Sequence, residues 1–189
     1  MMTGRHGRRS AARPGDAARP DEVAGSPGGP AALRPMLPAD LASVLALERE
    51  LFPEDPWSVQ MFAEEVAQPP SARLYLVAEA NDASGPAARR AVAGYAGMMF
   101  LPGGGQADVV TIAVARAYWG LGIGSALLGA LLQAAVARGC TELFLEVRED
   151  NPRARGLYLR RGFEEIGVRR GYYQPSGVDA IVMRKDLRR

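Results

Sequence analysis

The sequence predicts a mixed α/β fold, and two observations support this prediction. First, segments with the alternation of a strand are interspersed with segments whose apolar residues recur at helical spacing. Second, an apolar strand that ends at Val114 leads through Gly120, Gly122 and Gly124 into an apolar helix over residues 125–137. The length of 189 residues corresponds to one domain that can bury a sizeable core.

Residues 1–30 differ in composition from the rest of the chain. Arg, Ala, Pro and Gly dominate them, and Val23 is their only large aliphatic residue apart from the starting methionines. Because ordering this segment would lose entropy and bury little apolar area, we expect a disordered tail at 1–30 and one domain at 31–189. The tail holds five arginines and three acidic residues, which accounts for the formal net charge of +2. The domain therefore has no net basic charge that would indicate nucleic-acid binding.

The rare residues exclude several kinds of chemistry. The only histidine, His6, lies in the predicted tail, and the only cysteine is Cys140. Ser-His-Asp catalysis, Cys-His catalysis and the usual zinc sites lack residues, so we expect no metal. No internal disulfide can form, Arg8-Arg9 precedes no apolar signal segment, and no stretch is long enough to cross a membrane. These features favour a cytoplasmic protein that does not associate with membranes.

The first half of the domain is expected to contain two helices and four strands, the last of which ends at Val114. A short strand at 33–36 precedes a helix that begins at Ala39-Asp40, where apolar residues recur at helical spacing. Residues 52–56 interrupt this helix, and Ser58 is suited to cap the next one. Two middle strands follow at 74–80 and 91–101, joined by a polar loop at 81–85. A glycine turn at 102–105 leads into the strand that ends at Val114.

The second half of the domain continues after the apolar helix. Asn151 is a good N-cap for a short helix, Pro152 suits its first position, and Gly162 ends it. We expect a strand at 141–148 before this helix, which spans 151–161. Two final strands are expected at 163–172 and 178–185.

The turn before the apolar helix has the features of a cradle for phosphate groups. Its glycines lack Cβ atoms, so backbone N–H groups can approach an anion in front of the positive end of the helix. A Walker A loop would end in Gly-Lys-Ser/Thr, whereas this helix opens with Gly124-Ser125-Ala126, and the dinucleotide pattern G-x-G-x-x-G fits poorly. A glycine-rich turn with a purely structural role is the alternative.

Two residues beyond the turn are candidates for acid-base chemistry. Side chains alternate in the strand at 141–148, so Glu146 shares a face with Phe144 and opposes the apolar face. Tyr158 lies on the apolar side of the following helix, nearly above Asn151. The alternatives are a solvent-exposed carboxylate for Glu146 and a core position for Tyr158, although a phenol that faces a cleft can donate a proton.

Several segments occur together in a defined order: Pro56-Trp57-Ser58, Thr111-Ile-Ala-Val114, Gly122-Ile-Gly124, Leu145-Glu-Val-Arg148 with Asn151, Leu157-Tyr158 with Gly162-Phe163, Tyr172-Tyr173 and Asp179-Ala-Ile-Val-Met183. This combination closely resembles the bacterial ribosomal-protein-alanine N-acetyltransferase branch of the GCN5-related N-acetyltransferases. The resemblance spans about residues 31–187. It implies the fold of that family, with a central mixed, mostly antiparallel sheet flanked by helices.

The resemblance also implies the substrates and the site. Acetyl-CoA is the expected donor, and the α-amino group of a ribosomal protein N-terminus is the expected acceptor. By motif position Glu146 resembles the general base and Tyr158 the general acid of a direct transfer. Trp57, Tyr172 and Tyr173 are expected to bind the acceptor. The expected coenzyme-binding residues are Ile112, Val114, Trp119, Gly120, Leu121, Gly122, Ile123, Gly124, Ser125, Asn151 and Tyr158.

The chain departs from the family pattern in the turn. Trp119 replaces the usual Gln or Arg, and Leu121 replaces another residue that is commonly basic. Side-chain contacts to the phosphates are therefore expected to be weaker, which predicts a lower affinity for the coenzyme.

The acceptor is the part that the sequence determines least. A lysine side chain or a small-molecule amine would use the same donor half of the site. A non-catalytic sensor of acetyl-CoA and a protein-interaction role are further alternatives. The sequence leaves the oligomeric state open, with a monomer among the alternatives.

Overall fold

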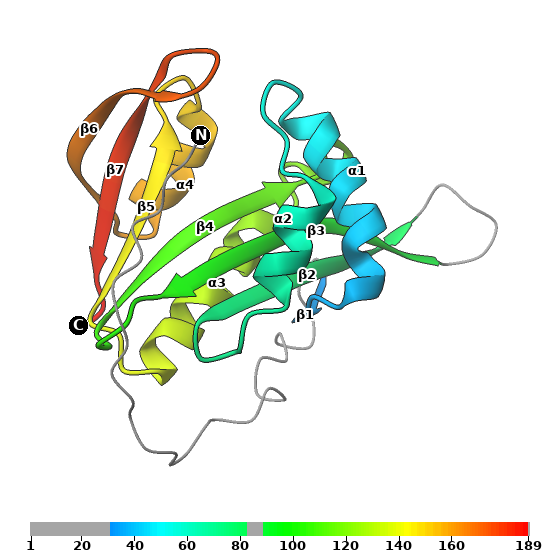
Figure 1. The fold of residues 1–189 in the computed structure, drawn as a ribbon, viewed down its shortest axis with the longest axis horizontal. Helices are drawn as coiled ribbons and strands as arrows, with labels where there is room; N and C mark the ends of the chain where they lie inside the picture. Colours follow the sequence, from blue (N-terminus) through cyan, green and yellow to red (C-terminus); the bar gives the residue numbers. More distant parts are fainter. Residues whose placement is uncertain (1–30, 83–88, 189) are drawn as a thin grey trace.

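The computed structural model describes residues 31–82 and 89–188, and their elements follow the order expected from the sequence (Figure 1). The tail predicted at 1–30 lies outside the described residues. The strands are β1 (Ala32–Pro35), β2 (Arg73–Asp82), β3 (Arg89–Phe100), β4 (Gln106–Val114), β5 (Glu142–Arg148), β6 (Glu164–Tyr173) and β7 (Val178–Asp186). The helices are α1 (Leu41–Leu51), α2 (Val59–Val66), α3 (Ile123–Ala137) and α4 (Pro152–Arg160), with the short 3-10 helices η2 (Pro38–Asp40) and η3 (Arg116–Tyr118).

One predicted loop differs at its start. The polar loop was expected to begin at Asn81, but Asn81 and Asp82 still pair with Arg90 and Arg89 across β2 and β3. Pairing between two long antiparallel strands thus overrides the polar composition of these residues.

The seven strands form one sheet in the order β1-β2-β3-β4-β5-β7-β6. Neighbouring strands are antiparallel except for β4 and β5, which are parallel. The mixed, mostly antiparallel sheet is therefore confirmed.

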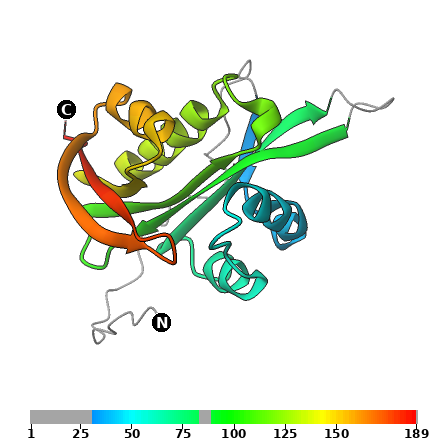
Figure 2. The same cartoon turned by 90° about the horizontal axis from the view of Figure 1, so that it is seen from above.

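Helices cover both faces of this sheet. Figure 2 shows α3 and α4 on one face and α1 and α2 on the other. Buried apolar residues accordingly form two clusters, one that includes Leu127 and Leu131 of α3 and one around Phe62 of α2 and Tyr95 of β3. Because α3 is apolar on nearly all sides, it can lie across the centre of the sheet with both residues fully buried.

Strands β4 and β5 are paired along only part of their length. Their parallel pairing runs from Gln106 opposite Glu142 to Val109 opposite Leu145. Beyond this point β4 stays paired with β3, while β5 stays paired with β7 as far as Arg148. The sheet thus divides near its centre, and Figure 1 shows the two strands diverging.

The described helices are short in comparison with a membrane. Within residues 31–82 and 89–188, none has the length and apolar content needed to cross one.

Candidate functional site

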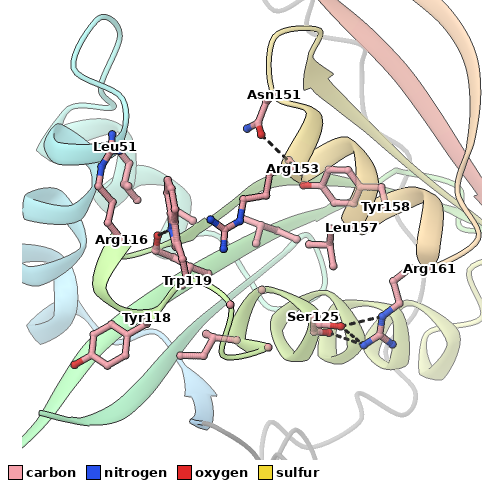
Figure 3. Close-up of a pocket in the computed structure, with 18 of the residues that line it drawn as sticks. Leu51, Arg116, Tyr118, Trp119, Ser125, Asn151, Arg153, Leu157, Tyr158 and Arg161 are labelled. Atoms are coloured by element: carbon pink, nitrogen blue, oxygen red, sulfur yellow. Dashed lines mark hydrogen bonds between the residues drawn. The ribbon is translucent and has the colours of Figure 1, made fainter. Parts of the chain in front are cut away.

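A cavity of about 440 Å³ lies between the ends of β4 and α4, beside the first turn of α3. Its wall combines the end of α1, the end of β4, η3, the glycine turn and most of α4. Trp119 extends toward this space from the end of η3, and Arg153 and Tyr158 extend toward it from α4 (Figure 3). The structure therefore brings together segments that are up to about a hundred residues apart in the chain.

Most of the predicted coenzyme-binding residues line this cavity. They are Ile112, Val114, Trp119, Gly120, Gly122, Ile123, Gly124, Ser125, Asn151 and Tyr158. Leu121 is not among the lining residues, and 56% of it is exposed. Its side chain thus lies outside the cavity.

The glycine turn needs glycine at two of its positions. Gly120 and Gly122 have φ angles of 84° and 83°, in the left-handed region that side chains with a Cβ rarely adopt. Gly122 is the N-cap of α3 and offers no side chain to the first turn. The first N–H groups of a helix have no partners within the helix, so they are available to an anion in the cavity.

The cavity carries more positive charge than the turn alone suggests. Four arginines line it, and none of its lining residues is a carboxylate; the arginines are Arg116, Arg153, Arg160 and Arg161. Sequence reasoning missed all four, although three of them follow Asn151 within a short arginine-rich helix. The weaker phosphate contacts expected from Trp119 and Leu121 therefore apply to the turn alone, because the rest of the cavity wall supplies arginines.

Trp119 connects the end of β4 to α4. Its indole Nε1–H donates a hydrogen bond to the carbonyl oxygen of Val114 at 2.6 Å. The guanidinium of Arg153 lies 4.2 Å from its ring centroid, and that of Arg116 lies 5.2 Å away on η3. Cation–π contacts of this kind hold the indole at the cavity wall.

Tyr158 is almost fully buried, with 7% of it exposed. Its ring packs edge-on against Phe163, and its hydroxyl points toward the side of the cavity where Asn151 caps α4 (Figure 3). Asn151 Oδ1 accepts the N–H of Ala154 at 3.0 Å, as its sequence position predicts. Burial raises the pKa of Tyr158 well above its usual value, and the nearby Tyr173 adds to the effect. The phenol therefore keeps its proton at neutral pH.

Glu146 does not line the cavity. Its neighbours Leu145 and Val147 belong to the cluster under α3, so Glu146 faces the opposite side of the sheet. Leu145 is in the last pair between β4 and β5, which puts Glu146 at the point where the sheet divides. The acid and the base predicted from the sequence thus lie on the two faces of the sheet.

The surroundings of Glu146 set its charge. Its Oε1 lies 3.2 Å from Nη2 of Arg169, on β6. Burial raises the pKa of Glu146, Arg169 lowers it, and Asp108 on β4 raises it again. The net effect is a carboxylate with a raised pKa, which suits a group that must accept a proton near neutral pH.

The three predicted acceptor-binding residues also lie outside the cavity. Tyr172 and Tyr173 contact each other edge-on at 5.2 Å, and the hydroxyl of Tyr173 donates to the backbone oxygen of Glu146 at 3.5 Å. Burial raises the pKa of Tyr173 to about 12. Because Tyr173 affects the pKa of Tyr158 and is itself affected by Glu146, its phenol lies within electrostatic range of both.

Trp57 belongs to the α1–α2 loop, which covers residues 52–58. Its ring packs against Phe62 at 5.1 Å, and its backbone N–H donates to Oε1 of Glu48 at 3.1 Å. Glu48 is 4% exposed and also accepts a hydrogen bond from the hydroxyl of Tyr95. A buried carboxylate that sequence reasoning missed thus holds the start of α2 in place, and its spacing on α1 would have marked it as inward-facing.

Residues 41–163 of the chain match the family model described as Acetyltransferase (GNAT) family. The chain is 39% identical over 160 residues to the uncharacterized protein ML0378 of Mycobacterium leprae. The matched region covers 83% of this chain but only 41% of that protein. It is 40% identical over 154 residues to the N-alpha-acetyltransferase RimI of Mycobacterium tuberculosis, covering 78% of this chain and 87% of that protein.

Solved structures show the same fold. The ribosomal-protein-S18-alanine N-acetyltransferase from Escherichia coli superimposes with a TM-score of 0.67 and 30% identity, covering 82% of this chain and 92% of that one. NAA60 of Arabidopsis thaliana in complex with acetyl-CoA superimposes with a TM-score of 0.71 and 21% identity, covering 82% and 97%. The family match includes the glycine turn, β5 and α4, which carry the cavity and Glu146.

Proposed function

Because the chain belongs to the acetyltransferase (GNAT) family, we propose that it transfers the acetyl group of acetyl-CoA to the α-amino group of a protein N-terminus. The proposed acceptor is the N-terminal alanine of a small-subunit ribosomal protein. The observation that carries the proposal is the pairing of an arginine-lined cavity at the start of α3 with a raised-pKa carboxylate at the division of the sheet. One half suits a polyanionic donor and the other suits an amine.

The donor half is supported by charge and shape. Backbone N–H groups at the start of α3 and the surrounding arginines favour the pyrophosphate of acetyl-CoA. The apolar part of the cavity, around Ile112, Val114 and Leu157, suits the pantetheine arm. Glu146 follows the last β4–β5 pair and Tyr158 lines the cavity, so these two groups are assigned to the point at which the thioester would meet the amine.

The acceptor half is supported by the residues on the far side of this division. Tyr173 and Arg169 contact Glu146, and Figure 1 shows the α1–α2 loop on the other side of the divided sheet from the β6–β7 connection. In this proposal an extended N-terminus with a small first residue enters between the α1–α2 loop and the β6–β7 connection. The name of the E. coli structure supports alanine as that residue.

Each residue has a defined role in the proposed transfer. An α-ammonium group has a reference pKa of about 7.7 to 8.0, so Glu146 accepts its proton directly or through one water. The free amine attacks the thioester carbonyl, the C–N bond forms, and the C–S bond breaks. Tyr158 donates its proton to the departing thiolate, and the second proton that the nitrogen loses returns through solvent to the Tyr158 phenolate. Transfer is direct and uses no covalent enzyme intermediate, since Cys140 is buried away from the cavity.

Turnover against a panel of acceptors tests the proposal. The panel contains peptides that start with Ala, Ser, Met or Gly, a lysine peptide blocked at its N-terminus, and an aminoglycoside, with release of the CoA thiol as the signal. We expect the Ala peptide to react fastest and the Ser peptide next. The same Ala peptide with an acetylated N-terminus is the matched control and should give no thiol release. Faster reaction of the blocked lysine peptide or of the aminoglycoside would assign the site to the alternative acceptors.

A further inference from the structure

The glycine turn leaves part of the charge of a pyrophosphate without compensation. Residues 119–124 include no Lys or Arg. The start of a helix contributes only about half an elementary positive charge, together with its free N–H groups. A cation from another element would complete the site.

Arg161 brings a guanidinium group to this turn from the end of α4. It is the C-cap of that helix, and Gly162, with a φ angle of 78°, turns the chain away behind it. Arg161 Nε donates to Oγ of Ser125 at 3.1 Å, and Nη2 donates to the Ser125 carbonyl oxygen at 3.1 Å. Nη2 also contacts Oγ of Ser125. Ser125 is the third residue of α3, so the guanidinium lies beside the free N–H groups of the first turn.

The charge of Arg161 is not neutralised in the part of the chain that the structure describes. It donates hydrogen bonds to the hydroxyl and carbonyl oxygens of Ser125, which are uncharged. Arg155, on the same helix, provides a contrast, because it is paired with Glu165 and does not line the cavity. Arg161 therefore keeps both its charge and its Nη1 donors for a ligand.

We propose that Arg161 binds the pyrophosphate of the acetyl donor beside the N–H groups of α3, and so supplies the cation that the turn lacks. The inference rests on the proposed use of acetyl-CoA. In this proposal Arg161, three positions after the proposed acid Tyr158, takes the role of the basic residues that the turn lacks. A charge-assisted hydrogen bond of this kind changes affinity by about tenfold.

A clamp between α4 and α3 is the competing role for Arg161. Its hydrogen bonds to Ser125 would serve such a clamp without any ligand. The two roles differ in whether they require the positive charge of the guanidinium. A clamp needs only its hydrogen-bond donors, whereas phosphate binding also needs the charge. Glutamine at position 161 keeps donors and removes the charge.

The experiment compares Arg161→Gln, Arg161→Lys and the control Arg155→Gln with the wild-type protein. Calorimetric titration measures the Kd of acetyl-CoA and of acetyl-dephospho-CoA, which retains the pyrophosphate but lacks the 3′-phosphate. The KM of S-acetylpantetheine, which has no phosphate, is measured in turnover. We expect Arg161→Gln to weaken both nucleotide donors by about tenfold and to leave the KM of S-acetylpantetheine unchanged. Arg161→Lys should recover most of the affinity, and Arg155→Gln should bind like the wild type.

Each other result overturns a distinct part of the argument. Unchanged acetyl-CoA affinity in Arg161→Gln, or an equal loss with S-acetylpantetheine, leaves Arg161 as a clamp. A loss that disappears with acetyl-dephospho-CoA assigns Arg161 to the 3′-phosphate instead. A wild-type protein that binds no acetyl-CoA overturns the proposed function itself.

Discussion

Arg169 on β6 and Glu146 on β5 form an ion pair across β7, with 3.2 Å between Nη2 and Oε1. The side chain of Arg169 is 55% exposed, whereas that of Glu146 is 28% exposed. The ion pair also opposes the effect of burial on the pKa of Glu146.

Replacing Glu146 by Gln should lower kcat by about 100-fold or more at neutral pH, because the site loses its proton acceptor but keeps its shape. Steady-state kinetics with the Ala peptide measure the loss, and a titration with acetyl-CoA should show unchanged affinity. Turnover equal to that of the wild type would remove Glu146 from the mechanism.

Removing either of the two charged neighbours of Glu146 should shift the pH dependence of kcat, and the two shifts should have opposite directions. Glu146 accepts a proton only when ionised, so activity falls as the pH drops through its raised pKa. Arg169→Gln removes the group that lowers this pKa, so the acid limb moves to higher pH. Asp108→Asn removes a group that raises it, so the acid limb moves to lower pH.

Profiles of kcat at saturating substrates check this pair of shifts. Glu146→Gln serves as the reference in which the limb is lost. Shifts in the same direction, or none, would contradict the assignment of the limb to Glu146.

Tyr158→Phe should slow turnover, because only the hydroxyl that protonates the thiolate is lost. The ring remains packed against Phe163, so the melting temperature should stay close to that of the wild type. A donor thioester with a more acidic thiol, which needs less help from an acid, should recover part of the rate. If the substitution acts mainly on melting temperature, Tyr158 is a core residue and not an acid.

Tyr173→Phe should raise the KM of the peptide and leave the KM of acetyl-CoA unchanged. Its hydroxyl lies next to Glu146 on the acceptor side and outside the donor cavity. Tyr118→Phe is the matched control, because Tyr118 lines the donor cavity and should leave the peptide KM alone. A parallel rise in both Michaelis constants would indicate a general disturbance of the fold.

Glu48→Ala should destabilise the protein by about 2 to 4 kcal/mol, since the buried Tyr95 hydroxyl and the Trp57 N–H lose their shared acceptor. Glu48→Gln keeps a carbonyl acceptor and should cost less. Urea unfolding measures both variants. An alanine variant as stable as the wild type would show that water replaces the carboxylate.

Local pattern was sufficient for the elements that carry the site. Alternation in residues 142–148 correctly predicted which side chains of β5 are buried, because the period of a strand is fixed by its backbone. The caps at Ser58 and Asn151 are likewise confirmed, since a cap depends on a few adjacent residues. The polar start of the loop at Asn81 was wrong, because strand pairing with β3 is not a local property.

The sequence by itself determined the order of elements, the conformation of the glycine turn and the chemical types available for catalysis. Only the tertiary structure decided that Glu146 and Tyr158 come from opposite faces of a sheet that divides beside them. It also brought Arg161 to Ser125, 36 residues away in the chain, and Arg169 to Glu146 across β7. Such contacts depend on how strands are ordered and where their pairing ends, and the free energy of that arrangement is summed over the whole core rather than over any local segment.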